Sequence, residues 1–362
     1  MAKSHNYFES IAMSLDSKRE HLVYFDYFRA ISIILIVMGH SYGSWERDSV
    51  IEMSFSNLIS GGTALFVFIS GFFFRNVFNE NYSYKAFVLK KCRSVLLPYL
   101  FMSISAMSLY YYLMLGFIPF PIQIGTGQAA ENSFAFIMNL GTGRTLTAYW
   151  YIPFIMLVFV ASPLFRKIME FSNRQILVLL ILTFALSIYI QRPALNLNPI
   201  HSFIYFFPFY LFGIYYSKQR QFLDGFLKNN VLVLLFLLIS AVVFMTLLGQ
   251  LGNLHKDFLW EWNGIDYMVL QKFLLILFLL SLTMKIQSRH IASMKYIADI
   301  SFAIFFIHPW VLLAVNELGI FQPYSSGAAF IFKFILVMAS SVLITFSFKL
   351  ALGSKSRYLV GY

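Results

Sequence analysis

The stretch "DYFRAISIILIVMGHSYGSW", residues 26–45, is apolar along most of its length but carries ionisable side chains towards both ends. Asp26 and Arg29 stand near its start, His40 follows eleven residues after Arg29, and every residue between Arg29 and His40 is uncharged. A helix needs about 20 apolar residues to cross a bilayer, and this stretch is long enough to do so. What the polar groups are for therefore depends on the solvent around the segment.

The composition of the whole chain answers that question. The sequence has 362 residues, of which 59% are hydrophobic and 12% charged, whereas about 25% of a soluble domain is charged. No polar linker divides the chain, so we expect one membrane domain. The single cysteine, Cys92, excludes an internal disulfide. The net charge of +11 fits the basic cytoplasmic loops of a membrane protein, and we expect no nucleic-acid partner.

The apolar segments predict an all-α fold, a polytopic transmembrane bundle of about ten spans. The expected spans are 25–45, 57–78, 94–116, 147–168, 175–191, 200–217, 231–249, 267–285, 298–317 and 327–350. We expect a transmembrane domain over 23–352, a cytoplasmic tail at 1–22 without a cleavable signal, and a cytoplasmic tail at 353–362.

The lysines and arginines predict the orientation. With the N-terminus in the cytoplasm, ten spans place most of them in inner segments, as the positive-inside rule requires. The outer loops then hold only Arg47, Arg144, Arg192 and Lys256. This distribution favours an even number of spans with both ends inside. Lys272 and Lys333 fall within spans near the outer surface, where we expect them to snorkel.

The outer loops offer few chemical motifs. The longest, 117–146, contains two Gly-Thr-Gly triplets, which indicate turns and leave open an entrance for a polar acceptor. Nothing in the chain resembles a zinc site, a Walker loop, a dinucleotide fingerprint or a nucleophile elbow. We therefore expect no metal.

Arg29 and His40 are predicted to share one face of the first span. Eleven residues at about 100° each make close to three turns and separate the two side chains by about 16 Å along the axis. Asp26 joins that face one turn earlier, and Ile33 and Ile36 lie between. With the N-terminus inside, Arg29 lies at the cytoplasmic boundary and His40 in the outer half.

Two interpretations of this pair stand side by side. Arg29 alone fits a positive-inside anchor, and His40 alone fits an interfacial group or a helix-packing hydrogen bond. Together they also fit a site, because arginine binds phosphate bidentately and histidine exchanges a proton near neutral pH. Acyl-coenzyme A, with phosphates at one end and a thioester a pantetheine arm away, would span the distance.

The sequence resembles the acyltransferase 3 family, integral-membrane enzymes that move acyl groups onto carbohydrates. The segment "FDYFRAISIILIVMGH" resembles the family's first-helix signature. Further segments are similar to family signposts and recur in the same order: "LFVFISGFFF" (65–74), "KKCRSVLLPYL" (90–100), "AYWYIPFIMLVFVASPLF" (148–165), "FPFYLFGIYY" (207–216) and "SFAIFFIHPW" (301–310). The resemblance covers nearly the whole chain.

The resemblance implies roles for the first span and the basic patch. His40 would be the general base that activates the acceptor hydroxyl. Arg29 would hold the acyl donor or orient the active site, and Asp26 would fix Arg29. A patch of Lys90, Lys91 and Arg93 would bind coenzyme A. The family often has two arginines three residues apart, whereas here Lys90 and Arg93 hold that spacing, so Lys90 is equally well explained as a loop anchor.

Other residues are candidates for the acceptor side. Ser301 and His308 match the ninth-span signpost, although His308 beside Pro309 also fits a packing role. Tyr149 and Trp150 would stack on a sugar or sit in the aromatic belt. Glu261, with Asp266 in the same outer loop 250–266, would bind sugar hydroxyls, support His40 or remain a solvated loop charge.

We therefore expect a multi-pass enzyme of the bacterial inner membrane. It would transfer an acyl group, most simply acetyl, from acyl-coenzyme A to a hydroxyl of an envelope polysaccharide or glycolipid. Direct transfer is the expectation, and an acyl-histidine intermediate stays open. The alternatives are an exporter of a polysaccharide or lipid-linked sugar, which should show paired halves with broken helices, and a non-enzymatic scaffold.

Overall fold

The computed structural model describes residues 22–43, 45–78, 82–113, 129–321 and 324–361, and its ordered structure is almost entirely helical. The first helices are α2 (Val23–His40), α3 (Val50–Ile59), α4 (Thr63–Phe78), α5 (Tyr84–Lys91), the π-helix η1 (Cys92–Leu96), α6 (Leu97–Leu113), α7 (Ala129–Thr142), α8 (Tyr151–Val160), α9 (Ser162–Met169) and α10 (Asn173–Ile190). Residues 1–21 of the expected N-terminal tail and the first Gly-Thr-Gly triplet lie outside the described residues.

The second half continues the same pattern. Its helices are η2 (Ala194–Asn196), α11 (Pro199–Lys218), α12 (Arg220–Asn229), α13 (Val231–Leu247), α14 (Tyr267–Ile286), η3 (Gln287–Arg289), α15 (Ala292–Asp299), α16 (Ser301–Glu317), α17 (Gly327–Leu352), η4 (Gly353–Lys355) and α18 (Ser356–Val360). β1 (Arg192–Pro193) and β2 (His255–Lys256) form a two-stranded parallel sheet with Arg192 opposite His255. The expected all-α class is confirmed.

Helix length and apolarity identify the candidate membrane spans. Six helical segments among the described residues could cross a bilayer, and up to nine if each sharply bent pair counts as one span. The bent pairs are α8 with α9 (55°), α12 with α13 (81°) and α15 with α16 (73°). All ten expected stretches contain a helix. Of the helices in these ten stretches, the 20-residue α11 is not among the nine candidate spans, because its tyrosines and prolines lower its hydropathy.

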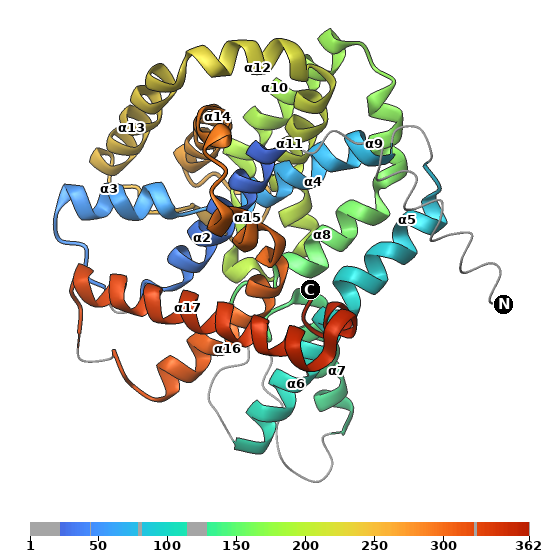
Figure 1. Cartoon of the computed structure of the whole chain (residues 1–362), viewed down its shortest axis with the longest axis vertical. Helices are drawn as coiled ribbons and strands as arrows, with labels where there is room; N and C mark the ends of the chain where they lie inside the picture. The colour runs from blue at the N-terminus through green and yellow to red at the C-terminus, as the bar shows by residue number, and fades with distance from the viewer. Residues whose placement is uncertain (1–21, 44, 79–81, 114–128, 322–323, 362) are drawn as a thin grey trace.

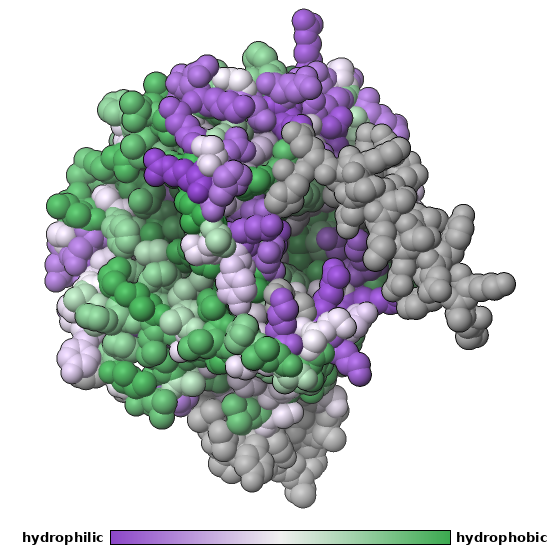
Figure 2. Space-filling view, viewed as in Figure 1, coloured by the Kyte–Doolittle hydropathy of each residue, from purple (hydrophilic) through white to green (hydrophobic). Residues whose placement is uncertain are grey.

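The surface of these helices is apolar where a soluble protein would be polar. Leu232 and Phe236 on α13 are 76% and 69% exposed, and Leu343 and Leu350 on α17 are 65% and 71% exposed. Figure 2 shows apolar side chains spread over the side where α13 and α17 lie, with polar ones gathered above, over α12. Exposed apolar patches of this size need a non-aqueous partner. The chain is a multi-pass membrane protein.

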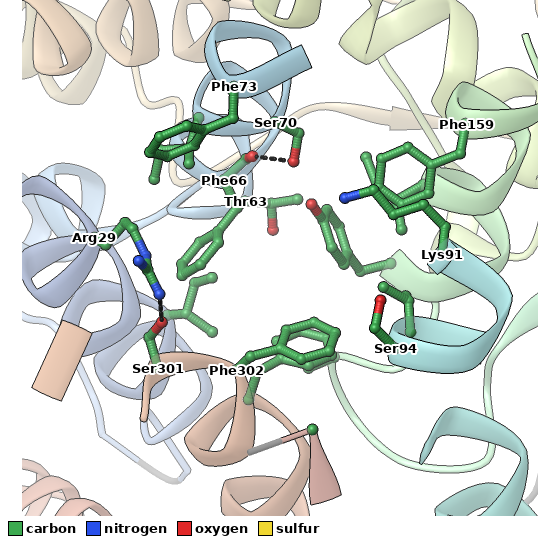
Figure 3. Close-up of a pocket in the computed structure, with 18 of the residues that line it drawn as sticks. Arg29, Thr63, Phe66, Ser70, Phe73, Lys91, Ser94, Phe159, Ser301 and Phe302 are labelled. Atoms are coloured by element: carbon green, nitrogen blue, oxygen red, sulfur yellow. Dashed lines mark hydrogen bonds between the residues drawn. The ribbon is translucent and has the colours of Figure 1, made fainter. Parts of the chain in front are cut away.

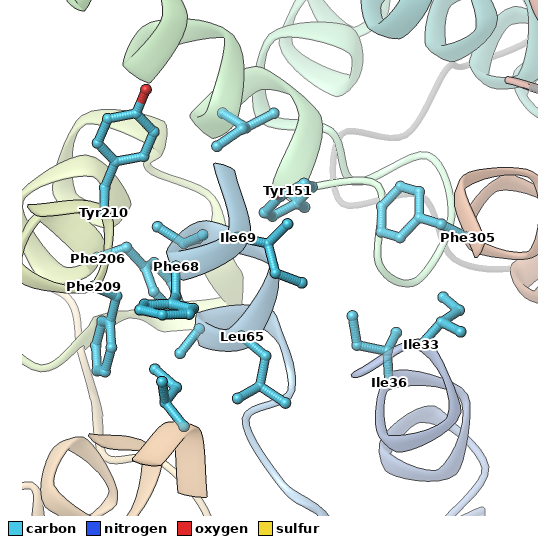
Figure 4. Close-up of a cluster of buried hydrophobic side chains, with 14 of the residues drawn as sticks. Ile33, Ile36, Leu65, Phe68, Ile69, Tyr151, Phe206, Phe209, Tyr210 and Phe305 are labelled. Carbon is cyan, nitrogen blue, oxygen red and sulfur yellow. The ribbon is translucent and has the colours of Figure 1, made fainter. Parts of the chain in front are cut away.

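The core is built around α2, α4 and α11, which lie together near the centre of the molecule (Figure 1). Gly71 on α4 and Gly213 on α11 allow the two helices to touch. A Cβ at Gly71 would lie 2.0 Å from the Tyr210 carbonyl oxygen, and one at Gly213 would lie 2.1 Å from that of Phe68. Small residues of this kind bring membrane helices together. Around the contact, aliphatic and aromatic side chains from α2, α4, α8, α11 and α16 interlock (Figure 4).

The expectation that Lys272 and Lys333 snorkel is wrong. Lys272 is fully buried, and its Nζ donates to the Tyr205 hydroxyl at 2.8 Å and to the Asn253 side chain. Lys333 is 6% exposed and donates to Asn316 at 2.8 Å. Snorkelling helps only where an amine would otherwise meet lipid. Both amines instead have polar partners inside the protein.

Candidate active site

A cavity of about 510 Å³ opens between α2, α4, α8 and α16, with α5, η1, α15 and α18 completing its wall. Most of the wall is aromatic or aliphatic. The charged and histidine side chains among its described lining are Arg29, His40, Lys91, Asp299 and Arg357. Arg29 and Lys91 reach towards the space from opposite sides (Figure 3). A concave, mostly apolar space of this volume with a few polar groups is typical of small-molecule sites.

One face of α2 supplies the polar ends of this cavity. Arg29 and His40 both line it, and Ile36 lines the stretch between them. The two side chains share a face because eleven residues correspond to about three helical turns. The stripe that begins and ends with ionisable groups and is apolar in its middle is therefore the wall of one site.

Arg29 is held at the break between α15 and α16. Its Nη2 donates to the Ala298 carbonyl oxygen at 2.7 Å and to the Ser301 Oγ at 3.3 Å, the second bond drawn in Figure 3. The 73° bend frees carbonyl groups at the end of α15 from intrahelical bonds, and a helix C-terminus favours a cation. The structure thus brings together two predicted residues, Arg29 and Ser301, and fixes the guanidinium at the cavity wall.

His40 ends α2 and meets groups from two other segments. Its Nδ1 lies 3.4 Å from the Thr147 hydroxyl, and its ring stacks on that of His308 with centroids 5.5 Å apart and planes 28° from parallel. The His308 Nδ1 lies 2.8 Å from the Ile304 carbonyl oxygen. Because a carbonyl only accepts, that bond assigns the His308 proton to Nδ1. His308 is buried behind His40 and does not line the cavity.

The segment before α8 supplies the wall beside His40. Ala148 has a φ of 70°, a conformation that costs a non-glycine residue energy and occurs often at functional sites. Trp150 then lines the cavity while the Arg192 guanidinium carbon lies 4.6 Å from the centroid of its ring. Burial lowers the pKa of Arg192 from its ordinary value. Trp150 is 4% exposed, so the aromatic-belt interpretation of this residue is wrong.

Tyr149 lies in the core instead. It is fully buried, it does not line the cavity, and its hydroxyl donates to the Phe306 carbonyl oxygen at 2.7 Å. The turn at Ala148 sends adjacent aromatic side chains to different places. Tyr149 therefore neither faces a sugar nor sits in an aromatic belt.

The basic patch enters the cavity through Lys91 alone. The Lys91 Nζ lies 4.5 Å from the centroid of the Phe159 ring and 5.6 Å from that of Phe87. Lys90 and Arg93 are exposed and outside the lining. The chain passes from α5 into the π-helix η1 directly after Lys91, and Ser94 and Val95 follow it on the cavity face. Such π-helical insertions are frequent at functional sites.

Comparison with known proteins agrees with the motifs. The family model described as an acyltransferase domain matches residues 22–349, nearly the whole chain. The chain belongs to the acyltransferase 3 family. It is accordingly a membrane acyltransferase. No curated protein and no solved structure matches it.

Two further predicted residues of this acyltransferase lie outside the cavity lining. Asp26 is buried in α2, one turn before Arg29. Glu261 is exposed in the loop after β2, and its carbonyl oxygen accepts from the Lys256 Nζ. Glu261 is thus remote from His40 in its contacts, as the solvated-charge interpretation requires. In the described part of the chain, no group of three or more His, Cys, Asp or Glu side chains could hold a metal.

Sequence reasoning missed three residues of the site: Thr147, Asp299 and Arg357. Thr147 contacts His40, and the other two line the cavity near Arg29 and Lys91. Asp299 ends α15 at the break before α16, whereas the sequence predicts one span over 298–317 for this region. Arg357 follows the last apolar stretch, where basic residues are ordinary topology signals, so its sequence context gave no sign of a site.

Proposed function

We propose that this membrane acyltransferase moves an acyl group, acetyl in the simplest case, from acyl-coenzyme A to a hydroxyl of an envelope polysaccharide or glycolipid. The observation that carries the proposal is the position of Arg29 and His40 at separate points of one cavity, with Lys91 facing Arg29 across it. No metal is needed for this chemistry.

The donor would lie along the cavity with its phosphates near the cations and its thioester near His40. The pantetheine arm would pass the apolar middle, where Ile36, Phe66 and Phe302 form the wall. Arg29, already fixed by Ala298 and Ser301, would present its remaining N–H groups to the donor. A preorganised fork loses little entropy when it binds a phosphate.

The reaction would then need one base. His40 accepts the proton of the acceptor hydroxyl, and the hydroxyl oxygen bonds to the thioester carbonyl carbon. The carbon–sulfur bond breaks, and the sulfur leaves as the thiolate of coenzyme A. It takes up the proton that His40 accepted, which returns His40 to its neutral form. The products are the acylated acceptor and free coenzyme A. His308, stacked on His40, keeps the ring in place for the transfer.

For the topology we propose ten spans, with both termini in the cytoplasm of a bacterial inner membrane. α11, in the sixth expected stretch, would bring the number of spans from nine to ten, since its 20 residues extend about 30 Å. The concentration of lysine and arginine in the inner segments supports this orientation. Cys92, the sole cysteine, provides a test: an impermeant thiol reagent should label it from the cytoplasmic side of inverted vesicles. Labelling in intact cells would contradict the orientation.

A transporter of the same glycan is the second candidate, and the three bent helix pairs favour it, because transporters bind substrates at broken helices. The purified chain in vesicles separates the two functions. The enzyme should release free thiol from acetyl-coenzyme A only when an envelope glycan extract is added. Movement of glycan across the vesicle membrane in the absence of an acyl donor, together with no thiol release when acetyl-coenzyme A is added, would establish the transporter instead.

A further inference from the structure

The cavity gathers cations from three distant parts of the chain. Arg29 comes from α2, Lys91 from the end of α5 and Arg357 from α18. The carboxylate in the described lining is that of Asp299, so the positive charges there outnumber the negative. Like charges that converge on a partly apolar space repel one another more strongly than in water. A bound anion would relieve that repulsion.

Arg357 is the least expected of these cations. It lies beyond residue 349, where the family match ends, in a segment that the sequence presented as a tail. The segment is nevertheless folded, and α18 packs on α6 and η1. Val360 is fully buried, and the Ser356 hydroxyl donates to the Gly353 carbonyl oxygen at 2.6 Å.

The end of α18 is seated against α16. Gly361, with a φ of 82°, lines the cavity, and a Cβ there would lie 2.6 Å from the Phe302 ring. α18 also packs on α16 and α17. Arg357 itself is exposed. These contacts hold α18 in place while they leave the Arg357 side chain accessible from the cavity.

Lys91 and Arg357 line the same cavity, and α18 packs on η1, the helix that begins directly after Lys91. The Lys91 ammonium lies over the rings of Phe87 and Phe159. Within the described residues, neither Lys91 nor Arg357 forms a salt bridge. Two cations from separate elements that line one cavity suit a ligand that brings its own negative charges. Phosphate groups do so, and an arginine fork binds them bidentately.

We propose that Arg357, together with Lys91, binds a phosphate of the nucleotide end of coenzyme A, so that the C-terminal helix α18 is part of the donor site. The inference rests on the proposed function, because it assigns the donor's phosphates within that cavity. Arg29 would then serve the part of the donor nearer His40. The exposed position of Arg357 suits the end of the donor that projects towards solvent.

The test is ligand binding to the purified full chain. The ligands are coenzyme A, 3′-dephospho-coenzyme A and pantetheine, and the variants are Arg357→Gln, Arg357→Lys and the control Lys355→Gln. Lys355 is an exposed cation on the same segment but outside the lining. Because Arg357→Gln removes a charge-assisted contact with a phosphate, it should weaken coenzyme A binding about tenfold or more. Arg357→Lys should weaken it less, and Lys355→Gln should match the wild type.

The other ligands localise the contact. Pantetheine affinity should be the same in all variants. If Arg357 holds the 3′-phosphate, dephospho-coenzyme A should bind Arg357→Gln and the wild type with equal affinity. If Arg357 holds the diphosphate, Arg357→Gln should bind both coenzyme A and dephospho-coenzyme A more weakly than the wild type does. Both results support the inference. Equal loss for pantetheine, or no loss for coenzyme A, overturns it and leaves the proposed function standing. Failure of the wild type to bind coenzyme A overturns both.

Discussion

His40 and His308 stack with their ring centroids 5.5 Å apart, although one ends α2 and the other lies in the middle of α16. His308 is tied by its own Nδ1 to the Ile304 carbonyl oxygen, and His40 has the Thr147 hydroxyl at its Nδ1. Of the two rings, only His40 lines the cavity. The pair thus consists of one imidazole that can meet substrate and a second that fixes its position.

This arrangement predicts that His308→Phe retains part of the activity. A phenyl ring can fill the same space and stack on His40, so we expect kcat to fall about tenfold, within the range for a positioning error at a general base, with KM for the acyl donor nearly unchanged. Steady-state kinetics on the purified variant measure both constants. Complete inactivity in a correctly folded His308→Phe protein would mean that His308 itself takes part in the chemistry.

Arg29 should not tolerate lysine. The guanidinium bridges Ala298 and Ser301 and keeps further N–H groups for the donor, whereas one ammonium group cannot match that fork. A lost charge-assisted hydrogen bond costs about 1.5–3 kcal/mol, or about ten- to a hundredfold in kcat/KM for acyl-coenzyme A. Acceptor KM should change little. An unchanged donor response in Arg29→Lys would return Arg29 to the role of a topological anchor.

Lys91 and Lys90 form a matched pair for testing the basic patch. They are adjacent and carry the same charge, but only Lys91 lines the cavity. We expect Lys91→Ala to raise KM for acyl-coenzyme A about tenfold, on the scale of one charged contact, while Lys90→Ala stays within twofold. Equal effects of the two substitutions would point to a diffuse electrostatic attraction of the donor by the surface.

Gly71 should be required for stability. A Cβ there would meet the Tyr210 carbonyl oxygen, which belongs to the backbone of α11 and cannot rotate away. Overpacking of this kind typically costs about 1–3 kcal/mol, so Gly71→Ala should lower the midpoint of thermal unfolding in detergent. Gly225 is a suitable control on α12, because a Cβ there meets nothing within 4 Å. A Gly71→Ala protein as stable as Gly225→Ala would contradict the tight crossing of α4 and α11.

The sequence predicts most reliably the features that depend on local geometry. The common face of Arg29 and His40 follows from helical periodicity alone, and the structure places both on one cavity. Ser301 was found through a motif and does bond to Arg29. In both cases the information lies in residues of one helix, or in one short motif.

Features set by tertiary contacts or by irregular backbone were missed. The π-helix after Lys91 determines which cation of the basic patch faces inward, and no hydrophobic pattern indicates it. The positive φ of Ala148 separates Tyr149 from Trp150. Lys272 is buried because Tyr205 and Asn253, far away in the sequence, supply its partners. Arg357 reaches the cavity only through the packing of α18 on α6 and η1.

The central claim is that His40 acts as the base in acyl transfer to an envelope glycan. The most direct measurement is mass spectrometry of envelope glycans from cells that lack the gene and from cells that express the wild type or His40→Ala at equal membrane levels. We predict a mass increment of one acyl group with the wild type, and its absence both without the gene and with His40→Ala. The same increment in His40→Ala cells, or no increment with the wild type, would contradict the claim.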